Sequence, residues 1–266
     1  MNKRILLAAC LIVIACVSLL TLTFVSANSR RSQQRGVDSS TDTRRVVVHA
    51  TGRGNPYINF EDGVELPASY TGTPEMQSLL KQNATEPRAL ASADFDEDGV
   101  PDLVCGYSRE GGGIITLYLG NVDSIFPNSP EAQQRKAEGT FTDSAFLTPA
   151  RVFEVPIAAD FVGAGDFDAD GHWDVVLAAR GGRELWMLPG DGKGSFLAAR
   201  AIALPGAVLS LITGEINRAD GLTDVVVGIL ADDGPKVVVF EGPEGALKAK
   251  PEIFSLPGEP KALALG

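Results

Sequence analysis

The chain is poor in the residues that most enzymes use for nucleophilic or metal-assisted chemistry. Its three cysteines are Cys10, Cys16 and Cys105, and its two histidines are His49 and His172, in 266 residues. No Ser-His-Asp grouping, G-x-S-x-G turn or zinc-ligand spacing occurs. These absences argue against serine, cysteine and zinc hydrolases, and we expect a protein that is not an enzyme.

Disulfides are also excluded from most of the chain. Cys10 and Cys16 lie in an apolar N-terminal segment, so removal of that segment leaves Cys105 alone. Cys105 follows Leu103 and Val104 in an apolar run and is expected to be a small buried residue of a strand.

Positive charge is scarce as well, with 23 Lys and Arg against 34 Asp and Glu and a net charge of −11. No basic stripe is present, which excludes nucleic acid as the expected partner. Many of the acidic residues are clustered and point to a cation as partner, whereas the others are expected to form a solvated surface. Aromatic residues make up only 7%, but 29 Gly and 16 Pro are present, a composition that favours an all-β fold with many turns.

The N-terminus has the pattern of an export segment. Lys3 and Arg4 precede an apolar run over residues 5–25, which ends in a small-residue cleavage pattern. Residues 1–27 are therefore predicted to be a signal peptide. The run is also long enough for an uncleaved membrane anchor, and a lipobox-like pattern before Cys16 is a third alternative. We expect a secreted, periplasmic or cell-surface protein, or one anchored in the membrane by this segment.

The remaining chain divides into a linker and one repeat domain. Residues 28–45 are polar and are predicted to be a disordered linker. Residues 46–266 form the predicted repeat domain, with loops and short strands over 51–87 and a polar inserted loop over 122–150. Residues 260–266 resemble the strand that precedes an acidic loop, so a further unit is expected and the domain is predicted to be C-terminally incomplete.

Three acidic loops define the repeat, at residues 94–102, 166–174 and 215–224. Apolar runs rich in β-branched residues precede and follow each loop, and a Gly-rich turn comes after the next apolar run. One unit is therefore strand, acidic loop, strand, turn, strand, Gly-rich turn and a fourth strand. Four short antiparallel strands make one blade of a β-propeller. The sequence predicts an all-β fold of such blades in an open, incomplete propeller.

The first and second loops have the residue pattern of calcium sites. Ca²⁺ takes roughly six to eight oxygen ligands, and four carboxylates within nine residues repel one another unless a cation lies between them. An acidic turn without metal is the alternative. The predicted ligands are Asp94, Asp96, Asp98, the Val100 carbonyl and Asp102 in the first loop, and Asp166, Asp168, Asp170, the His172 carbonyl and Asp174 in the second. The His172 ring is expected to face solvent.

An EF-hand has a similar beginning but is excluded here. Its loop needs Glu at position 12 and flanking helices, whereas position 12 is Cys105 in the first loop and Leu177 in the second, and strand formers flank both. The third loop departs from the pattern, so a turn without metal is an equal alternative there. Its weaker candidate ligands are Glu215, Asn217, Asp220 and Asp224.

The two complete loops, the strands behind them and the turn Gly190-Asp191-Gly192-Lys193-Gly194-Ser195-Phe196 resemble FG-GAP/VCBS repeats and the blades of the integrin α-subunit propeller. The resemblance covers residues 88–266. It implies a calcium-binding β-propeller for adhesion, ligand display or carbohydrate contact, with an extracellular protein or carbohydrate as partner. The expected function is an exported, non-catalytic binding or adhesion module. The alternatives are a fragment of a calcium-dependent polysaccharide-acting enzyme and a structural repeat attached to another domain.

Overall fold

The computed structural model describes residues 54, 69–216 and 220–265 of the chain. The predicted signal peptide and alternative anchor (1–27) and the predicted linker (28–45) lie outside the described residues. Within the described part, no helix is long and apolar enough to cross a membrane.

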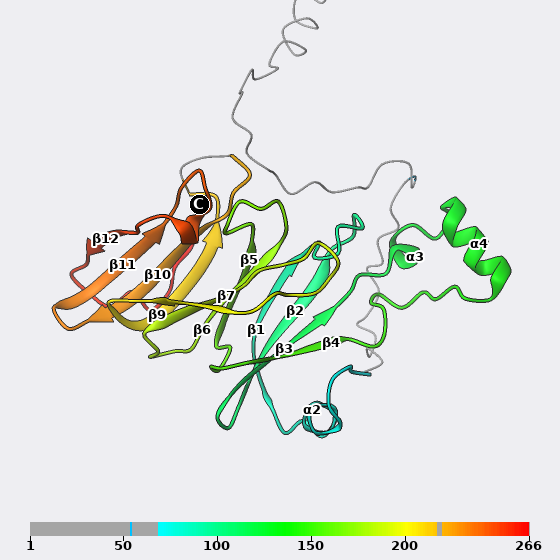
Figure 1. Ribbon diagram of the computed structural model, residues 1–266, viewed down its shortest axis with the longest axis horizontal. Helices are drawn as coiled ribbons and strands as arrows, with labels where there is room; N and C mark the ends of the chain where they lie inside the picture. Colours follow the sequence, from blue (N-terminus) through cyan, green and yellow to red (C-terminus); the bar gives the residue numbers. More distant parts are fainter. Residues whose placement is uncertain (1–53, 55–68, 217–219, 266) are drawn as a thin grey trace, which may run out of the picture. The chain divides into compact units, whose positions relative to one another are not determined.

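The described residues form three antiparallel sheets of four strands each (Figure 1). In every sheet the strands are hydrogen-bonded in chain order. This arrangement confirms the all-β fold and the predicted four-stranded unit. The first sheet contains β1 (Glu86–Ala93), β2 (Asp102–Arg109), β3 (Gly112–Tyr118) and β4 (Arg151–Val155); the second contains β5 (Phe161–Gly165), β6 (Asp174–Ala178), β7 (Glu184–Leu188) and β8 (Arg200–Ala203); the third contains β9 (Gly206–Gly214), β10 (Asp224–Ala231), β11 (Gly234–Phe240) and β12 (Glu252–Ser255).

Strand β6 shows why the apolar runs behind the acidic loops are continuous and do not alternate with polar residues. All of its residues are buried. Val175 and Leu177 belong to the core shared with the first sheet, and Val176 and Ala178 belong to the core shared with the third. A strand covered on both faces needs apolar side chains in both directions.

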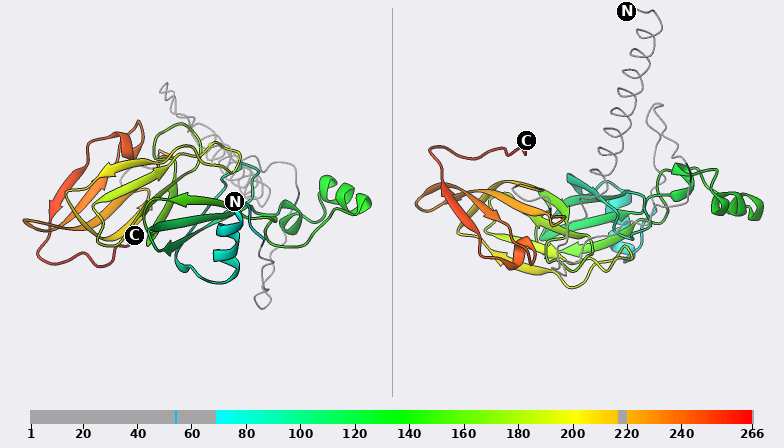
Figure 2. Two further views of the ribbon diagram at one scale, coloured as in Figure 1. Left: turned by 60° about the horizontal axis from the view of Figure 1, so that its bottom comes forward. Right: turned by 90° about the horizontal axis from the view of Figure 1, so that it is seen from above.

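The first strands of successive sheets, β1, β5 and β9, lie next to one another. Two glycines of β5 allow the third sheet to approach closely: a Cβ atom at Gly163 would lie 2.3 Å from Thr213 Cγ2, and one at Gly165 would lie 2.3 Å from Thr223 Cβ. Figure 2 shows the three sheets side by side from two further directions. The packing of corresponding strands from sheet to sheet is the arrangement of successive propeller blades, so we call the sheets the first, second and third blade.

A helix lies where the sequence was expected to have only loops and short strands. Helix α2 (Pro74–Lys81) begins with Thr73 as N-cap, whose Oγ1 accepts a hydrogen bond from Met76 N at 3.3 Å. Met76 and Leu80 pack against Ile114 on the face of the first blade that points away from the second. The prediction missed this helix because an eight-residue helix with two buried apolar side chains has a weak periodic signal.

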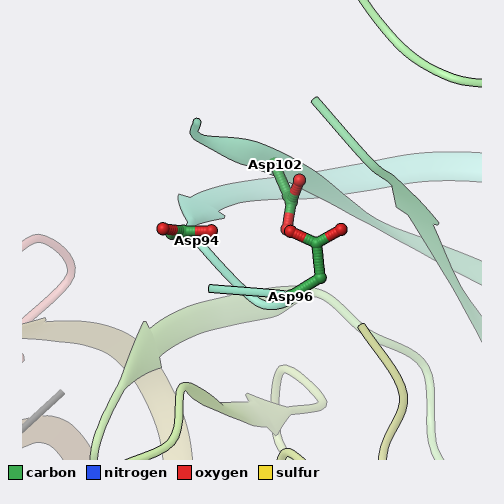
Figure 3. Close-up of side chains that lie close together, drawn as sticks. All are labelled: Asp94, Asp96 and Asp102. Carbon is green, nitrogen blue, oxygen red and sulfur yellow. The ribbon is translucent and has the colours of Figure 1, made fainter. Parts of the chain in front are cut away.

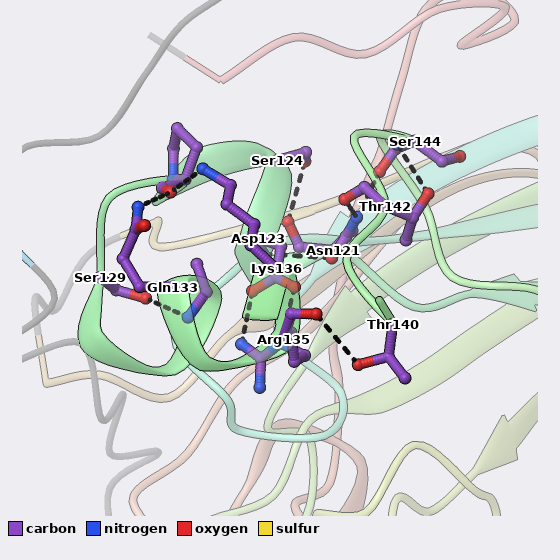
Figure 4. A network of polar contacts seen from close by, with 12 residues as sticks. Asn121, Asp123, Ser124, Ser129, Gln133, Arg135, Lys136, Thr140, Thr142 and Ser144 are labelled. Atoms are coloured by element: carbon purple, nitrogen blue, oxygen red, sulfur yellow. Dashed lines mark hydrogen bonds and ion pairs between the residues drawn. The ribbon is translucent and has the colours of Figure 1, made fainter. Parts of the chain in front are cut away.

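The predicted inserted loop between β3 and β4 is also partly helical, with α3 (Val122–Ile125) and α4 (Pro130–Glu138). Ser129 caps α4, and Gly139 ends it in the left-handed conformation. Figures 1 and 2 show α4 standing out from the strands. Arg135 forms a two-pronged ion pair with the buried Asp123, which ties α4 to α3 (Figure 4).

The end of the described chain differs from the expected fourth unit. The short 3₁₀ helix η1 (Ala246–Lys248) precedes β12, which is the last regular element, and residues 260–265 form no strand. Ser210 Oγ donates a hydrogen bond to the Pro260 carbonyl at 2.5 Å, and a Cβ atom at Gly228 would lie 2.8 Å from Pro260. This segment therefore lies against β9 and β10 of the third blade.

Candidate metal centres in the acidic loops

Each acidic loop connects the first and second strands of a blade, and the first two loops have the same backbone conformation. Glu97 and Ala169, at the fourth position, both have φ of 56°, and Gly99 and Gly171, at the sixth, both have φ of 88°. Glycine adopts this left-handed conformation without steric cost. The two loops therefore share a backbone conformation as well as a sequence pattern.

The first carboxylate of each loop holds the turn in place. Asp94 accepts hydrogen bonds from the backbone N–H groups of Asp98 at 3.0 Å and Gly99 at 2.8 Å. Asp166 makes the corresponding pair in the second loop, at 3.2 and 3.1 Å. Burial raises the pKa of both Asp94 and Asp166.

The last carboxylate of each loop joins the loop to the Gly-rich turn of the same blade. Asp102 accepts hydrogen bonds from Phe95 N at 2.8 Å and from Gly120 N at 2.6 Å. Asp174 accepts the corresponding bonds from Phe167 N at 3.0 Å and Gly190 N at 2.9 Å. Burial raises the pKa of Asp102 and of Asp174 to about 7, although the backbone hydrogen bonds act in the opposite direction.

Three of the four predicted carboxylates converge in each of these loops. Asp94, Asp96 and Asp102 each offer an oxygen atom within 4.8 Å of the others, and Figure 3 shows the carboxyl groups of Asp96 and Asp102 turned toward each other. The second loop forms the corresponding group with Asp166, Asp168 and Asp174.

The other predicted ligands lie outside these two groups. Asp98 accepts a hydrogen bond from Val100 N at 2.9 Å, and Asp170 accepts one from His172 N at 2.9 Å. The Val100 side chain is buried in the protein core. Coordination by Asp98, Asp170 and the carbonyls of Val100 and His172 stays a prediction.

The donor set of both groups fits a hard divalent cation. All the converging atoms are carboxylate oxygens, the ligands that Ca²⁺ prefers. Asp168 is only 5% exposed, and its buried Oδ1 accepts no hydrogen bond from any described residue, while its Oδ2 lies 3.2 Å from Arg200 Nη1. Buried carboxylates are costly when ionised unless they are compensated, and a cation between them supplies that compensation.

The sequence led us to expect that the His172 ring faces solvent, but the ring contacts Glu97 of the first loop. Its Nδ1 lies 2.6 Å from Glu97 Oε1, and its side chain is 40% exposed. This hydrogen bond raises the pKa of His172. Glu97 belongs to the first loop and was not singled out in the sequence, because no local pattern marks a contact between residues 75 positions apart.

The third loop keeps three of the corresponding hydrogen bonds, but three converging carboxylates are not found in its described part. Glu215 accepts a hydrogen bond from Gly221 N at 3.1 Å, and Asp224 accepts one from Ile216 N at 3.0 Å. Asp220 accepts one from Leu222 N at 3.1 Å. Asn217 lies outside the described residues, and the described part of this loop contains no group of three converging carboxylates.

Comparison with protein-family models gives two matches, both within the blades. The FG-GAP repeat model matches residues 87–118, which include the first loop, and the FG-GAP-like repeat model matches residues 166–227, which begin at the second loop. No curated protein matches the chain. FG-GAP repeats suggest a propeller-type module for binding or adhesion. The repeated loops, the four-stranded sheets and these two matches together show that the chain contains FG-GAP repeats.

Proposed function

We propose that the chain is an exported, non-catalytic binding or adhesion module whose first and second acidic loops each hold a Ca²⁺. One observation carries the proposal: three largely buried carboxylates converge within 4.8 Å in both loops, on backbones of the same conformation. Asp94, Asp96 and Asp102 would hold the first ion. Asp166, Asp168 and Asp174 would hold the second.

The chemistry of the donors favours calcium over softer metals. Zinc and copper sites usually contain imidazole or thiolate ligands, and neither cluster contains a histidine or cysteine side chain. A bound calcium ion supplies positive charge that makes ionised buried carboxylates tolerable. An exported module of this kind would bind calcium weakly, with a Kd of roughly 10⁻⁴–10⁻³ M.

The proposed role of the two cation sites is to make one end of the first blade and one end of the second blade rigid. Asp102 joins its own loop to Gly120, and Asp174 joins its loop to Gly190. A cation that fixes these carboxylates would therefore also fix the loop and the neighbouring turn. Rigid loops on a β-scaffold are the usual place for a binding surface. The expected partner is an extracellular protein or carbohydrate, in keeping with the export pattern of residues 1–27.

Calcium titration calorimetry on the full chain tests the metal assignment. The unaltered protein is expected to bind about two Ca²⁺. Asp96→Asn and Asp168→Asn should each remove one site, because each takes a charged ligand from one cluster. Asp143→Asn changes an exposed aspartate outside the loops and serves as the control. The absence of saturable binding in the unaltered protein would refute the assignment.

The binding role needs a separate test. The full chain is applied to a glycan array and to immobilised extracellular proteins, once in Ca²⁺ and once in EDTA. A partner bound in Ca²⁺ and released in EDTA supports the module. Turnover of a polysaccharide in Ca²⁺ would contradict the non-catalytic role.

A further inference from the structure

We propose that the two cation sites are coupled through the turn at residues 190–196, so that an ion in either loop strengthens binding in the other. This inference rests on the proposed calcium binding and adds a regulation to it. The turn belongs to the second blade by sequence, but it contacts the loops of both the first and the second blade.

The turn is attached to the second site at its first residue. Gly190 N donates a hydrogen bond to Asp174 Oδ1 at 2.9 Å. The turn is also closed on itself, because Asp191 Oδ1 accepts hydrogen bonds from Lys193 N and Ser195 N, both at 2.9 Å. A displacement of Asp174 would therefore move the turn at residues 190–196 as one unit, because its internal hydrogen bonds hold it together.

The far end of the same turn is attached to the first site. Gly194 N donates a hydrogen bond to the Phe95 carbonyl at 2.9 Å, and the rings of Phe95 and Phe196 meet edge to face with centroids 5.5 Å apart. Phe95 N in turn donates to Asp102 Oδ2 at 2.8 Å. Phe95 thus lies between the turn and a carboxylate of the first cluster.

A second contact joins the two loops directly. Glu97, at the fourth position of the first loop, meets His172, at the seventh position of the second, with 2.6 Å between Oε1 and Nδ1. Gly192 of the turn packs against this pair: a Cβ atom there would lie 2.5 Å from His172 Nδ1 and 2.8 Å from Glu97 Oε1. The turn and the contact between the loops therefore form one continuous set of contacts.

The same attachment recurs one blade further along. In the turn of the third blade, Leu247 N donates a hydrogen bond to the Phe167 carbonyl at 3.1 Å, as Gly194 does to Phe95. A Cβ atom at Gly245 would lie 2.5 Å from the same carbonyl oxygen. A hydrogen bond from the turn of one blade to the acidic loop of the preceding blade therefore recurs in the repeat. Through this bond, ordering of one loop would restrict the motion of the next.

The expected sign of the coupling follows from these contacts. An ion in the second loop fixes Asp174, the turn and Phe95, so the first loop has less freedom to lose when it binds its own ion. Such shared ordering gives positive cooperativity, and linkage requires the effect to be equal in both directions.

Calcium calorimetry on the full chain measures the coupling. Asp168→Asn leaves the first site and Asp96→Asn leaves the second, which gives the two single-site association constants. In the unaltered protein, the product of the two stepwise constants should exceed the product of the single-site constants by about fivefold or more. Two bound ions with a ratio of one would overturn the coupling alone. No binding in any form would overturn the proposed calcium function as well.

Gly192→Ala tests the route, because its methyl group enters the contact between Glu97 and His172. This variant should still bind two ions, with the ratio reduced to about one. Gly181→Ala is the matched control, since Gly181 also has a left-handed φ (77°) but open space around its Cβ position. Phe196→Leu, which removes the ring contact with Phe95, should lower the ratio too and covers the case that Gly192→Ala does not fold. Equal ratios in these variants and the control would overturn the route.

Discussion

Asp102 of the first blade and Asp174 of the second accept hydrogen bonds at corresponding positions: each accepts one from an N–H of its own loop and one from an N–H of the following turn. Both are almost fully buried. Burial raises the pKa of each carboxyl to about 7. Each loop that we propose to hold a cation is thus fixed to its blade by a buried carboxyl group that is costly to ionise without a cation beside it.

The raised pKa predicts how the stability of the metal-free protein depends on pH. Protons bind Asp102 and Asp174 more tightly in the folded chain (pKa about 7) than in the unfolded chain, where the ordinary value is 3.8. The contribution of these groups to stability is therefore fully present below about pH 4 and is lost as the pH rises to about 7. We therefore expect the urea midpoint of the protein in EDTA to fall as the pH rises from about 4 to about 7.

The double variant Asp102→Asn/Asp174→Asn isolates the effect, because asparagine does not titrate. Its urea midpoint between pH 4 and pH 7 should fall less than that of the unaltered protein. Parallel pH profiles of the two proteins would show that these carboxyls are ordinary acids in the fold.

Removal of the Arg200 side chain should strengthen calcium binding in the second loop. Arg200 Nη1 lies 3.2 Å from Asp168 Oδ2 and would compete with a bound metal ion for that carboxylate. The Arg200 side chain is 57% exposed, so the gain from Arg200→Ala should be modest, about threefold or less in affinity. Calorimetry in the Asp96→Asn background measures it.

Arg183→Ala, which removes an exposed ion pair with Asp232, is the control for that experiment. Weaker binding after Arg200→Ala would mean that the arginine orients Asp168 and does not compete for it.

The third loop should contribute to stability without metal. Asp224 is buried and accepts the Ile216 N–H, so Asp224→Ala should lower the free energy of unfolding by about 1–3 kcal/mol. The loss should be the same in Ca²⁺ and in EDTA. A loss confined to Ca²⁺, measured by urea denaturation in both buffers, would place a metal in this loop.

The helical insertion should depend on one ion pair. Arg135 is the partner of the buried Asp123 (Figure 4) but is itself partly exposed, so Arg135→Ala leaves a buried acceptor without this partner and should destabilise α3 and α4 by about 1–3 kcal/mol. Limited proteolysis should then cut within 122–150 while the blades stay intact. Lys136→Ala removes an exposed cation–π contact with Phe141 and should change the cleavage rate little.

Local chemistry explains why the blades and loops could be predicted. The turn from Asp94 to Asp102 is held by local hydrogen bonds, because Asp94 accepts the N–H groups four and five residues later, and the apolar run of β6 reports burial on both faces. Four-stranded units follow from such patterns without knowledge of tertiary contacts.

Contacts between blades could not be predicted in the same way. Glu97 and His172 are 75 positions apart in the chain, and no sequence pattern near either residue predicts their contact. Helix α2 depends on Met76 and Leu80 finding Ile114 on the first blade, which is a tertiary contact and not a sequence period. The structure brings together three of the four predicted carboxylates in each of the first two loops, while Asp98 and Asp170 lie outside these groups and accept the N–H two residues later.

The central claim, that divalent ions hold the first two acidic loops together, is tested most directly by thermal melting of the full chain in Ca²⁺ and in EDTA. We predict a higher melting temperature in Ca²⁺, a gain largely lost in Asp96→Ala/Asp168→Ala and kept in Asp143→Ala. Superimposable melting curves of the unaltered protein in the two buffers would contradict the account.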